Sequence, residues 1–131
     1  MDKRLKVLIS ENGADFMGEY VPALEEAGMR GICTERDGRT LLERIEAEHP
    51  DVVLADLFMP RLDGIGVMKA CEGKKDAPAF LILYNFTSPA PERAVMGSGA
   101  AYFMYSPFAA DELAHRVLQV VGIAAAPPQR C

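Results

Sequence analysis

The feature that most constrains the fold of this chain is the regular alternation of short apolar runs with segments of helical period. Apolar runs of strand length lie at residues 5–9, 31–34, 52–56, 80–84 and 101–105. Apolar residues recur at helical spacing over 14–27, 39–49, 65–71 and 109–121, and a shorter helix is expected over 89–98. Five strand–helix units in this order predict an α/β protein, with a parallel sheet covered by helices on both faces.

Length and charge exclude several classes of protein. The 131 residues suffice for one domain, and the net charge of −5 argues against direct nucleic-acid binding by this segment. No apolar run is long enough to cross a bilayer, and the N-terminus lacks a signal-peptide pattern. The three cysteines have no metal-binding or disulfide spacing, which favours a reduced, cytoplasmic protein. We expect one domain over residues 4–122, with residues 123–131 forming a tail or a linker to an unseen output domain.

A single carboxylate ends the third predicted strand. Asp56 follows the apolar run Val52–Ala55, and Met59-Pro60 and Asp63-Gly64 come directly after it. Ligands and chemistry gather at the carboxyl ends of strands in open α/β sheets, so Asp56 is expected at a reactive edge. The structural alternative is a strand-end carboxylate that only caps the next turn. Asp63 is interpreted as a turn residue with Gly64.

The run Asp-x-x-Met-Pro-x-x-Asp-Gly from Asp56 to Gly64 resembles the receiver domain of bacterial response regulators. The stretches that carry the resemblance are 50–67, 99–103 and 107–108. Within the family, the chain is most similar to the receiver of the sporulation master regulator of spore-forming Firmicutes. The resemblance implies a doubly wound, flavodoxin-like (βα)5 fold with strand order 2-1-3-4-5.

The resemblance also implies a phosphoryl-accepting site at Asp56, served by a histidine kinase or a phosphotransfer protein. In the family, two acidic residues after the first strand hold Mg²⁺ together with the phosphoacceptor and a backbone carbonyl. Those positions are Ser10 and Glu11 here, and the carbonyl belongs to Phe58. One acid is therefore absent and the other is a glutamate, so only weak Mg²⁺ binding is expected. Glu11 is alternatively a solvated loop acid.

Three further family positions lie on the last two strands. A hydroxyl residue is usual where this chain has Tyr84, and a lysine is usual where it has Ser106. Phe103 keeps the position of the aromatic switch residue. Serine cannot replace the fixed positive charge of a lysine, so we expect Asp56 to be a poor phosphoacceptor. We further hypothesise that Tyr84 fills the space into which Phe103 would swing, so that the switch is frozen.

The leading interpretation is an atypical receiver domain that is not an enzyme and acts through protein–protein contacts. Self-association through the helix 4, strand 5 and helix 5 face is expected, with Tyr102 and Leu118 partly exposed. One alternative is a phosphorylation-competent receiver that controls a DNA-binding output domain. Another is a stand-alone ligand- or partner-binding module on the same fold. A hydrolase is disfavoured because no cation or general acid is evident near Asp56; His49 and His115 fit no catalytic arrangement.

Overall fold

The computed structural model describes residues 4–11, 16–85, 102–106 and 109–125. The five strands are β1 (Leu5–Ile9), β2 (Met29–Cys33), β3 (Val52–Asp56), β4 (Ala79–Asn85) and β5 (Tyr102–Ser106). They form one sheet in the order β2-β1-β3-β4-β5, and every neighbouring pair is parallel. This confirms the predicted doubly wound α/β fold and its strand order.

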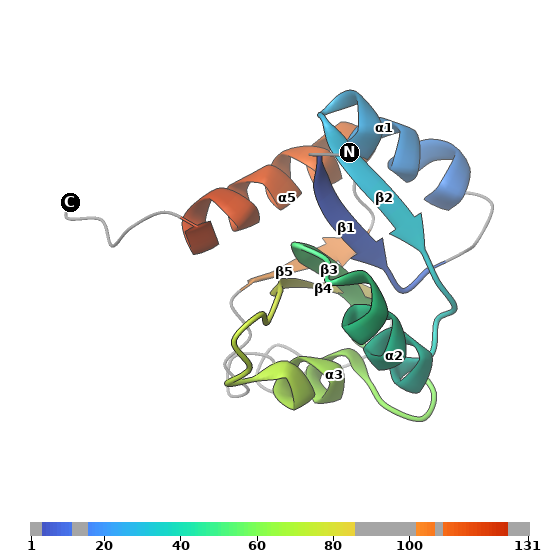
Figure 1. The fold of residues 1–131 in the computed structure, drawn as a ribbon. Helices are drawn as coiled ribbons and strands as arrows, with labels where there is room; N and C mark the ends of the chain where they lie inside the picture. Colours follow the sequence, from blue (N-terminus) through green and yellow to red (C-terminus); the bar gives the residue numbers. More distant parts are fainter. Residues whose placement is uncertain (1–3, 12–15, 86–101, 107–108, 126–131) are drawn as a thin grey trace.

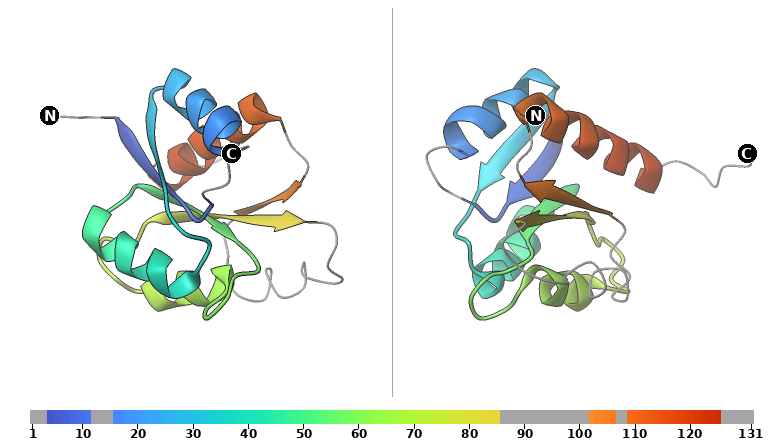
Figure 2. Two further views of the ribbon diagram at one scale, coloured as in Figure 1. Left: turned by 90° about the vertical axis from the view of Figure 1, so that its right-hand side faces the viewer. Right: turned by 180° about the vertical axis from the view of Figure 1, so that it is seen from behind.

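Helices cover both faces of the sheet. A π-helical turn (Phe16–Tyr20) leads into α1 (Val21–Glu26), which lies with α5 (Ala110–Ala125) on one face (Figures 1 and 2). The opposite face carries α2 (Gly38–Glu48) and α3 (Gly64–Cys71), as the same two figures show. The arrangement is the three-layer sandwich expected when parallel strands are joined by right-handed crossovers.

The central strands supply two separate cores because successive side chains of a strand point to opposite faces. Val52 and Leu54 pack with the α1 and α5 side, whereas Val53 and Ala55 pack with the α2 and α3 side. All four residues are fully buried. This double burial explains why β3 is a continuous apolar run in the sequence, and it fixes Asp56 as the first residue of the strand that is not buried.

Several predicted boundaries differ from the structure. The helix predicted over 14–27 begins, within the described residues, with the π-helical turn, and Pro22 lies in the first turn of the regular helix that follows. Proline fits there because the first amides of a helix need no intrahelical acceptor. The last helix extends to Ala125, four residues beyond the predicted end. The helix predicted over 89–98 lies outside the described residues.

Within the described ranges, no helix combines the length and the apolar character needed to cross a membrane.

Candidate phosphoacceptor site

The predicted site residues lie at the carboxyl edge of the sheet, where the arrowheads of the strands point in Figure 1. Ser10 and Glu11 follow β1, and Asp56 ends β3. The backbone of Tyr84 lies near the end of β4, and Asn85 is in register with Ser106 at the end of β5. Phe103 pairs with Ile82, deeper in the sheet. The side chains of Tyr84, Phe103 and Ser106 lie outside the described part of the structure, so their predicted roles remain predictions.

Ser10 joins β1 to β3. Its side chain is almost fully buried, and its Oγ accepts a hydrogen bond from the backbone N–H of Asp56 at 2.9 Å. The same hydroxyl donates to the carbonyl oxygen of Leu54 at 3.3 Å, and the Ser10 amide donates to that carbonyl at 3.0 Å. Ser10 therefore hydrogen-bonds to the backbone of β3, the strand that ends in Asp56, and its hydroxyl is directed toward that strand.

Both carboxylate oxygens of Asp56 have partners. The backbone N–H of Phe58 donates to Oδ1 at 3.1 Å, and Nε of Arg36 donates to Oδ2 at 2.9 Å. The Asp56 side chain is 24% exposed and that of Arg36 is 48% exposed. The expectation that no cation accompanies Asp56 is therefore wrong, because an arginine from the loop after β2 reaches it.

A second ion pair fixes the loop that carries Arg36. Asp37 caps the N-terminus of α2, where its Oδ1 accepts from the amides of Arg39 and Thr40. Its Oδ2 accepts from Nε of Arg61 at 2.8 Å. The Gly38 amide also donates to the carbonyl of Pro60 at 3.2 Å. The loop after β2 and the loop after β3 are thus linked by two ion pairs and one backbone hydrogen bond.

The charges and hydrogen bonds at this edge shift the pKa values of several side chains. The hydrogen bond to Asp56, reinforced by the charges of Asp56 and Glu11, raises the pKa of the Arg36 guanidinium. The hydrogen bond from Arg61 lowers the pKa of Asp37, as do the two amides that it caps. Burial raises the pKa of the Cys33 thiol, and the negative charge of Glu11 acts in the same direction. Glu11 is half-buried, and its negative charge acts on both Arg36 and Cys33.

The turn after Asp56 brings α3 against the end of β3. A Cβ added to Gly64 would lie 2.5 Å from the carbonyl oxygen of Asp56, so only glycine permits this approach. Asp63 accepts a hydrogen bond from the Gly66 amide at 2.7 Å and is the N-cap of α3. The interpretation of Asp63 as a simple turn residue is corrected accordingly, since an aspartate followed by a helical segment is a typical cap.

Comparison with known proteins identifies the family to which this fold belongs. The family model of the response regulator receiver domain matches residues 7–118. The chain belongs to the response regulator receiver family. It is 35% identical over 82 residues to the response regulator MprA of Mycolicibacterium vanbaalenii, an alignment that covers 63% of this chain and 36% of that protein. The chain thus spans about a third of the length of that curated relative.

Solved receiver structures have the same fold. The receiver domain of a Francisella response regulator is 27% identical, with a TM-score of 0.76, and the match covers 92% of this chain and 98% of that one. The signal receiver domain of a histidine kinase from Syntrophus aciditrophicus is 21% identical, with a TM-score of 0.79 and 96% of each chain covered. The second likeness concerns the fold alone.

Membership in the family assigns the chain a coarse role. It is a receiver domain of the two-component type, and such domains are signalling modules that interact with histidine kinases or phosphotransfer proteins. Receiver domains typically bind Mg²⁺ at the phosphorylation site. The residues of this chain fit such an ion poorly. Among the described residues, no three acidic, histidine or cysteine side chains are grouped to hold a metal, and a guanidinium lies against Asp56.

The sequence interpretation missed Arg36, Asp37 and Arg61. In the sequence, Asp37-Gly38 is typical of a turn after the second strand, although an aspartate before a helical segment also signals an N-cap. Arg36 is twenty residues away from Asp56, and β1 lies between their strands. The predicted topology could have indicated that the Arg36 loop lies near Asp56, because all loops that follow parallel strands lie at the same edge of the sheet.

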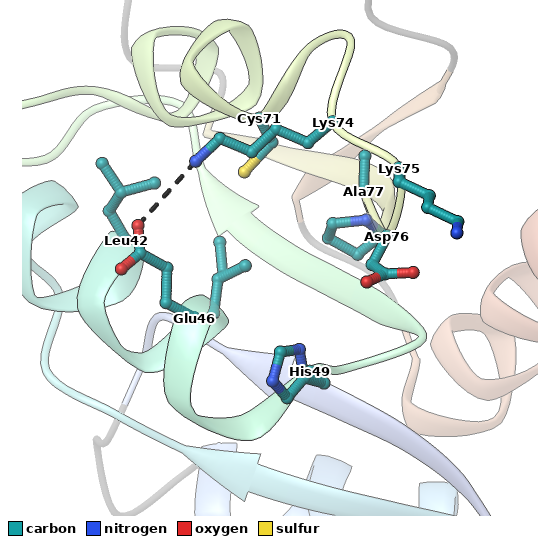
Figure 3. A pocket seen from close by; sticks show the side chains of 10 residues that line it. Leu42, Glu46, His49, Cys71, Lys74, Lys75, Asp76 and Ala77 are labelled. Atoms are coloured by element: carbon teal, nitrogen blue, oxygen red, sulfur yellow. Dashed lines mark ion pairs between the residues drawn. The ribbon is translucent and has the colours of Figure 1, made fainter.

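A separate hollow of about 220 Å³ lies at the opposite edge of the sheet, between the C-terminal ends of α2 and α3 and the segment before β4 (Figure 3). Leu42, Ile45 and Cys71 line it, and Lys74 extends toward Glu46, with Nζ 3.8 Å from Oε2. This hollow is not part of the Asp56 site, since its residues belong to the segments that lead into the strands, 42–49 before β3 and 71–78 before β4.

Proposed function

We propose that this chain is an atypical receiver domain whose Asp56 accepts phosphoryl groups weakly or not at all, and which signals through protein–protein contacts. The observation that carries the proposal is the state of the Asp56 carboxylate, both oxygens of which already have hydrogen-bond partners. An incoming phosphoryl group would meet the Arg36 guanidinium at Oδ2.

The residue types around Asp56 support the same proposal. Phosphoryl transfer depends on positioning and on neutralisation of charge. Ser106 supplies no positive charge at the position where the family has a lysine, and Tyr84 replaces the small hydroxyl residue. Removal of one preorganised electrostatic donor typically reduces a rate by a factor of ~10²–10³. The losses need not add, because such groups act as a unit.

Weak Mg²⁺ binding is part of the proposal. Glu11, Asp56 and the backbone carbonyl of Phe58 would hold the ion, and Ser10 would contribute little because its hydroxyl serves the backbone of β3. A bound Mg²⁺ would neutralise charge between Asp56 and an approaching phosphoryl group. Two carboxylates suffice for an ion that keeps several waters, but they do not make a tight site.

Incubation with a small phosphodonor and Mg²⁺, followed by intact-mass analysis, tests the proposal. We expect only a small fraction of the protein to gain the mass of one phosphoryl group. Asp56→Asn is the matched control, because it keeps the shape of the side chain but removes the nucleophilic carboxylate. Stoichiometric modification of the wild type that the Asp56→Asn variant lacks would favour the alternative of a competent receiver.

We also propose that the chain self-associates through the face that includes β5 and α5, the described elements of the predicted helix 4, strand 5 and helix 5 face. Leu118 on α5 is 40% exposed, which leaves an apolar side chain on this face available for such a contact. Sedimentation velocity at increasing protein concentration tests this proposal. We expect a rise in mean sedimentation coefficient that Leu118→Lys abolishes, whereas a constant coefficient for the wild type would contradict it.

A receiver within a longer regulator is the second candidate, and the partial coverage of MprA favours it. The reading frame beyond Cys131 decides between a stand-alone module and a receiver with an output domain, for which a basic, helix-rich extension would indicate DNA binding. The narrower similarity to sporulation regulators is supported by the motif around Asp63 and residues 101–103. It predicts that loss of the gene prevents spore formation.

A further inference from the structure

The guanidinium of Arg36 is hydrogen-bonded to the carboxylate of Asp56 that a metal ion would need as a ligand. Its Nε lies 2.9 Å from Oδ2 of Asp56, and the other oxygen accepts the Phe58 amide. A divalent cation on Oδ2 would stand beside this guanidinium, and the two positive charges would repel each other. Arg36 and a metal ion are therefore alternative partners of Asp56.

The main chain on either side of this contact is anchored. On one side, the Thr34 amide donates to the carbonyl of Ile9 at 2.8 Å. On the other side, Asp37 binds Arg61 and caps α2. A Cβ on Gly38 would overlap the carbonyl oxygen of Leu62, which shows how closely the two loops approach. Because its neighbours are held, Arg36 reaches Asp56 from a defined backbone position.

The contact brings a fixed positive charge to one of the two acids that are candidates for holding Mg²⁺, with Nε of Arg36 2.9 Å from Oδ2 of Asp56. A guanidinium donates its hydrogen bonds in one plane, a geometry that a metal ion does not share.

We infer that Arg36 is the resident counterion of Asp56 and competes directly with divalent cations for this carboxylate. This inference rests on the proposed function, because it treats Asp56 as the phosphoacceptor position of a receiver. It makes metal affinity a property that a loop residue controls.

Titration of the full chain with Mg²⁺ tests the inference, with calorimetry and amide chemical shifts of Phe58 as readouts. Arg36→Gln keeps a polar side chain of similar reach without the charge, and Arg39→Gln is the matched control, because Arg39 is also exposed and lies on the same segment. The Arg36–Asp56 pair is half exposed, and such pairs are weak. We therefore expect Arg36→Gln to bind Mg²⁺ about 1.5- to fivefold more tightly than the wild type.

Two further measurements sharpen the test. Arg36→Lys keeps the charge and should leave Mg²⁺ affinity closer to that of the wild type than Arg36→Gln does. In the wild type, the Nε–H resonance of Arg36 should shift as Mg²⁺ is added, because the metal displaces its hydrogen bond. Equal affinities for the wild type and both Gln variants would overturn the inference. Weaker binding by Arg36→Gln, or no binding by any form, would also overturn it.

This experiment contains no phosphodonor. A change in metal affinity on removal of Arg36 therefore supports the competition whether Asp56 is a poor or a competent phosphoacceptor. Conversely, weak phosphorylation of the wild type with unchanged metal binding in Arg36→Gln would leave the proposed function intact and reject the role of Arg36.

Discussion

The buried hydroxyl of Ser10, the residue after β1, makes two hydrogen bonds to the backbone of β3 and so joins the two strands. Substitution with alanine leaves the Asp56 amide without its acceptor and removes a donor to Leu54. An amide deprived of its partner typically costs about 1–3 kcal/mol, so Ser10→Ala is expected to lower the free energy of unfolding by that amount. Urea denaturation measures the loss. Ser10→Cys restores volume but bonds weakly; full recovery by cysteine would show that packing, and not the hydrogen bonds, accounts for the effect.

Asp37 gives the stability of the domain an acid dependence. Its pKa in the folded state is lowered by Arg61 and by the amides that it caps. The charged carboxylate therefore contributes stability above its ordinary pKa of about 4, and the contribution disappears as the pH falls through the lower folded value. Asp37→Asn keeps the capping oxygen and loses the charge. The difference in melting temperature between the wild type and this variant should be constant near neutral pH and shrink below pH of about 4.

Thermal unfolding of both proteins across the acid range checks this expectation. Arg61→Gln removes the main cause of the pKa shift and should show a similarly reduced acid dependence. Parallel melting curves for the wild type and Asp37→Asn down to the acid end of the range would contradict the role assigned to the ion pair.

The residues around Asp56 show how far sequence reasoning extends at this scale. The position of Asp56 at a strand end follows from an apolar run that stops at one acid, and the structure places it there. The hydrogen bonds of Ser10 and the approach of Arg36 could not be predicted in this way. They depend on side-chain directions in loops, where neither hydrophobic period nor strand order specifies which charged groups meet.

At the scale of elements, the entry into α2 is constrained by the loop that follows β3. Gly38 begins the helix, and an added Cβ would overlap the carbonyl of Leu62. Helical propensity alone would favour alanine here, but the backbone of the neighbouring loop cannot easily yield. We expect Gly38→Ala to destabilise the fold by about 1–3 kcal/mol, the usual cost of overpacking.

Gly122 provides the matched control for this prediction. It lies within α5, is exposed, and an added Cβ would meet no atom within 4 Å among the described residues. Gly122→Ala should therefore stabilise the protein by roughly 0.5–1 kcal/mol through helical propensity. Denaturant unfolding of the two variants should shift in opposite directions, and a shift of the same sign would contradict the close approach inferred at Gly38.

Strands and helices were predictable at this scale because their signals are periodic. The bounds of β1 and β3 match the sequence expectation, and β2, β4 and β5 differ by one or two residues. The π-helical turn at Phe16–Tyr20 was not predictable, because its residues have an ordinary helical pattern. The rings of Phe16 and Tyr20, four residues apart in this turn, have centroids 4.6 Å apart.

At the scale of the whole molecule, one of the two cores lies between α5 and the sheet that ends in Asp56. Leu113, Val117 and Val120 attach α5 to one face of the sheet. A ligand at Asp56 can reposition that helix only if it binds two arrangements of the domain with different affinity. If Tyr84 blocks the movement of Phe103, as we hypothesise, no second arrangement is available for a ligand to favour, and the domain presents one surface permanently.

Amide NMR spectra with and without beryllofluoride and Mg²⁺ test this expectation on the intact chain. We expect shifts confined to residues near the site, such as Ser10 and Phe58, while the amides of Ala110–Ala125 remain unchanged. The reason is the hypothesis that Tyr84 blocks the movement of Phe103, so that no second arrangement is populated. A coherent shift along α5, or two populated rotamers of Phe103, would show that the switch operates and that phosphoryl binding is transmitted across the sheet.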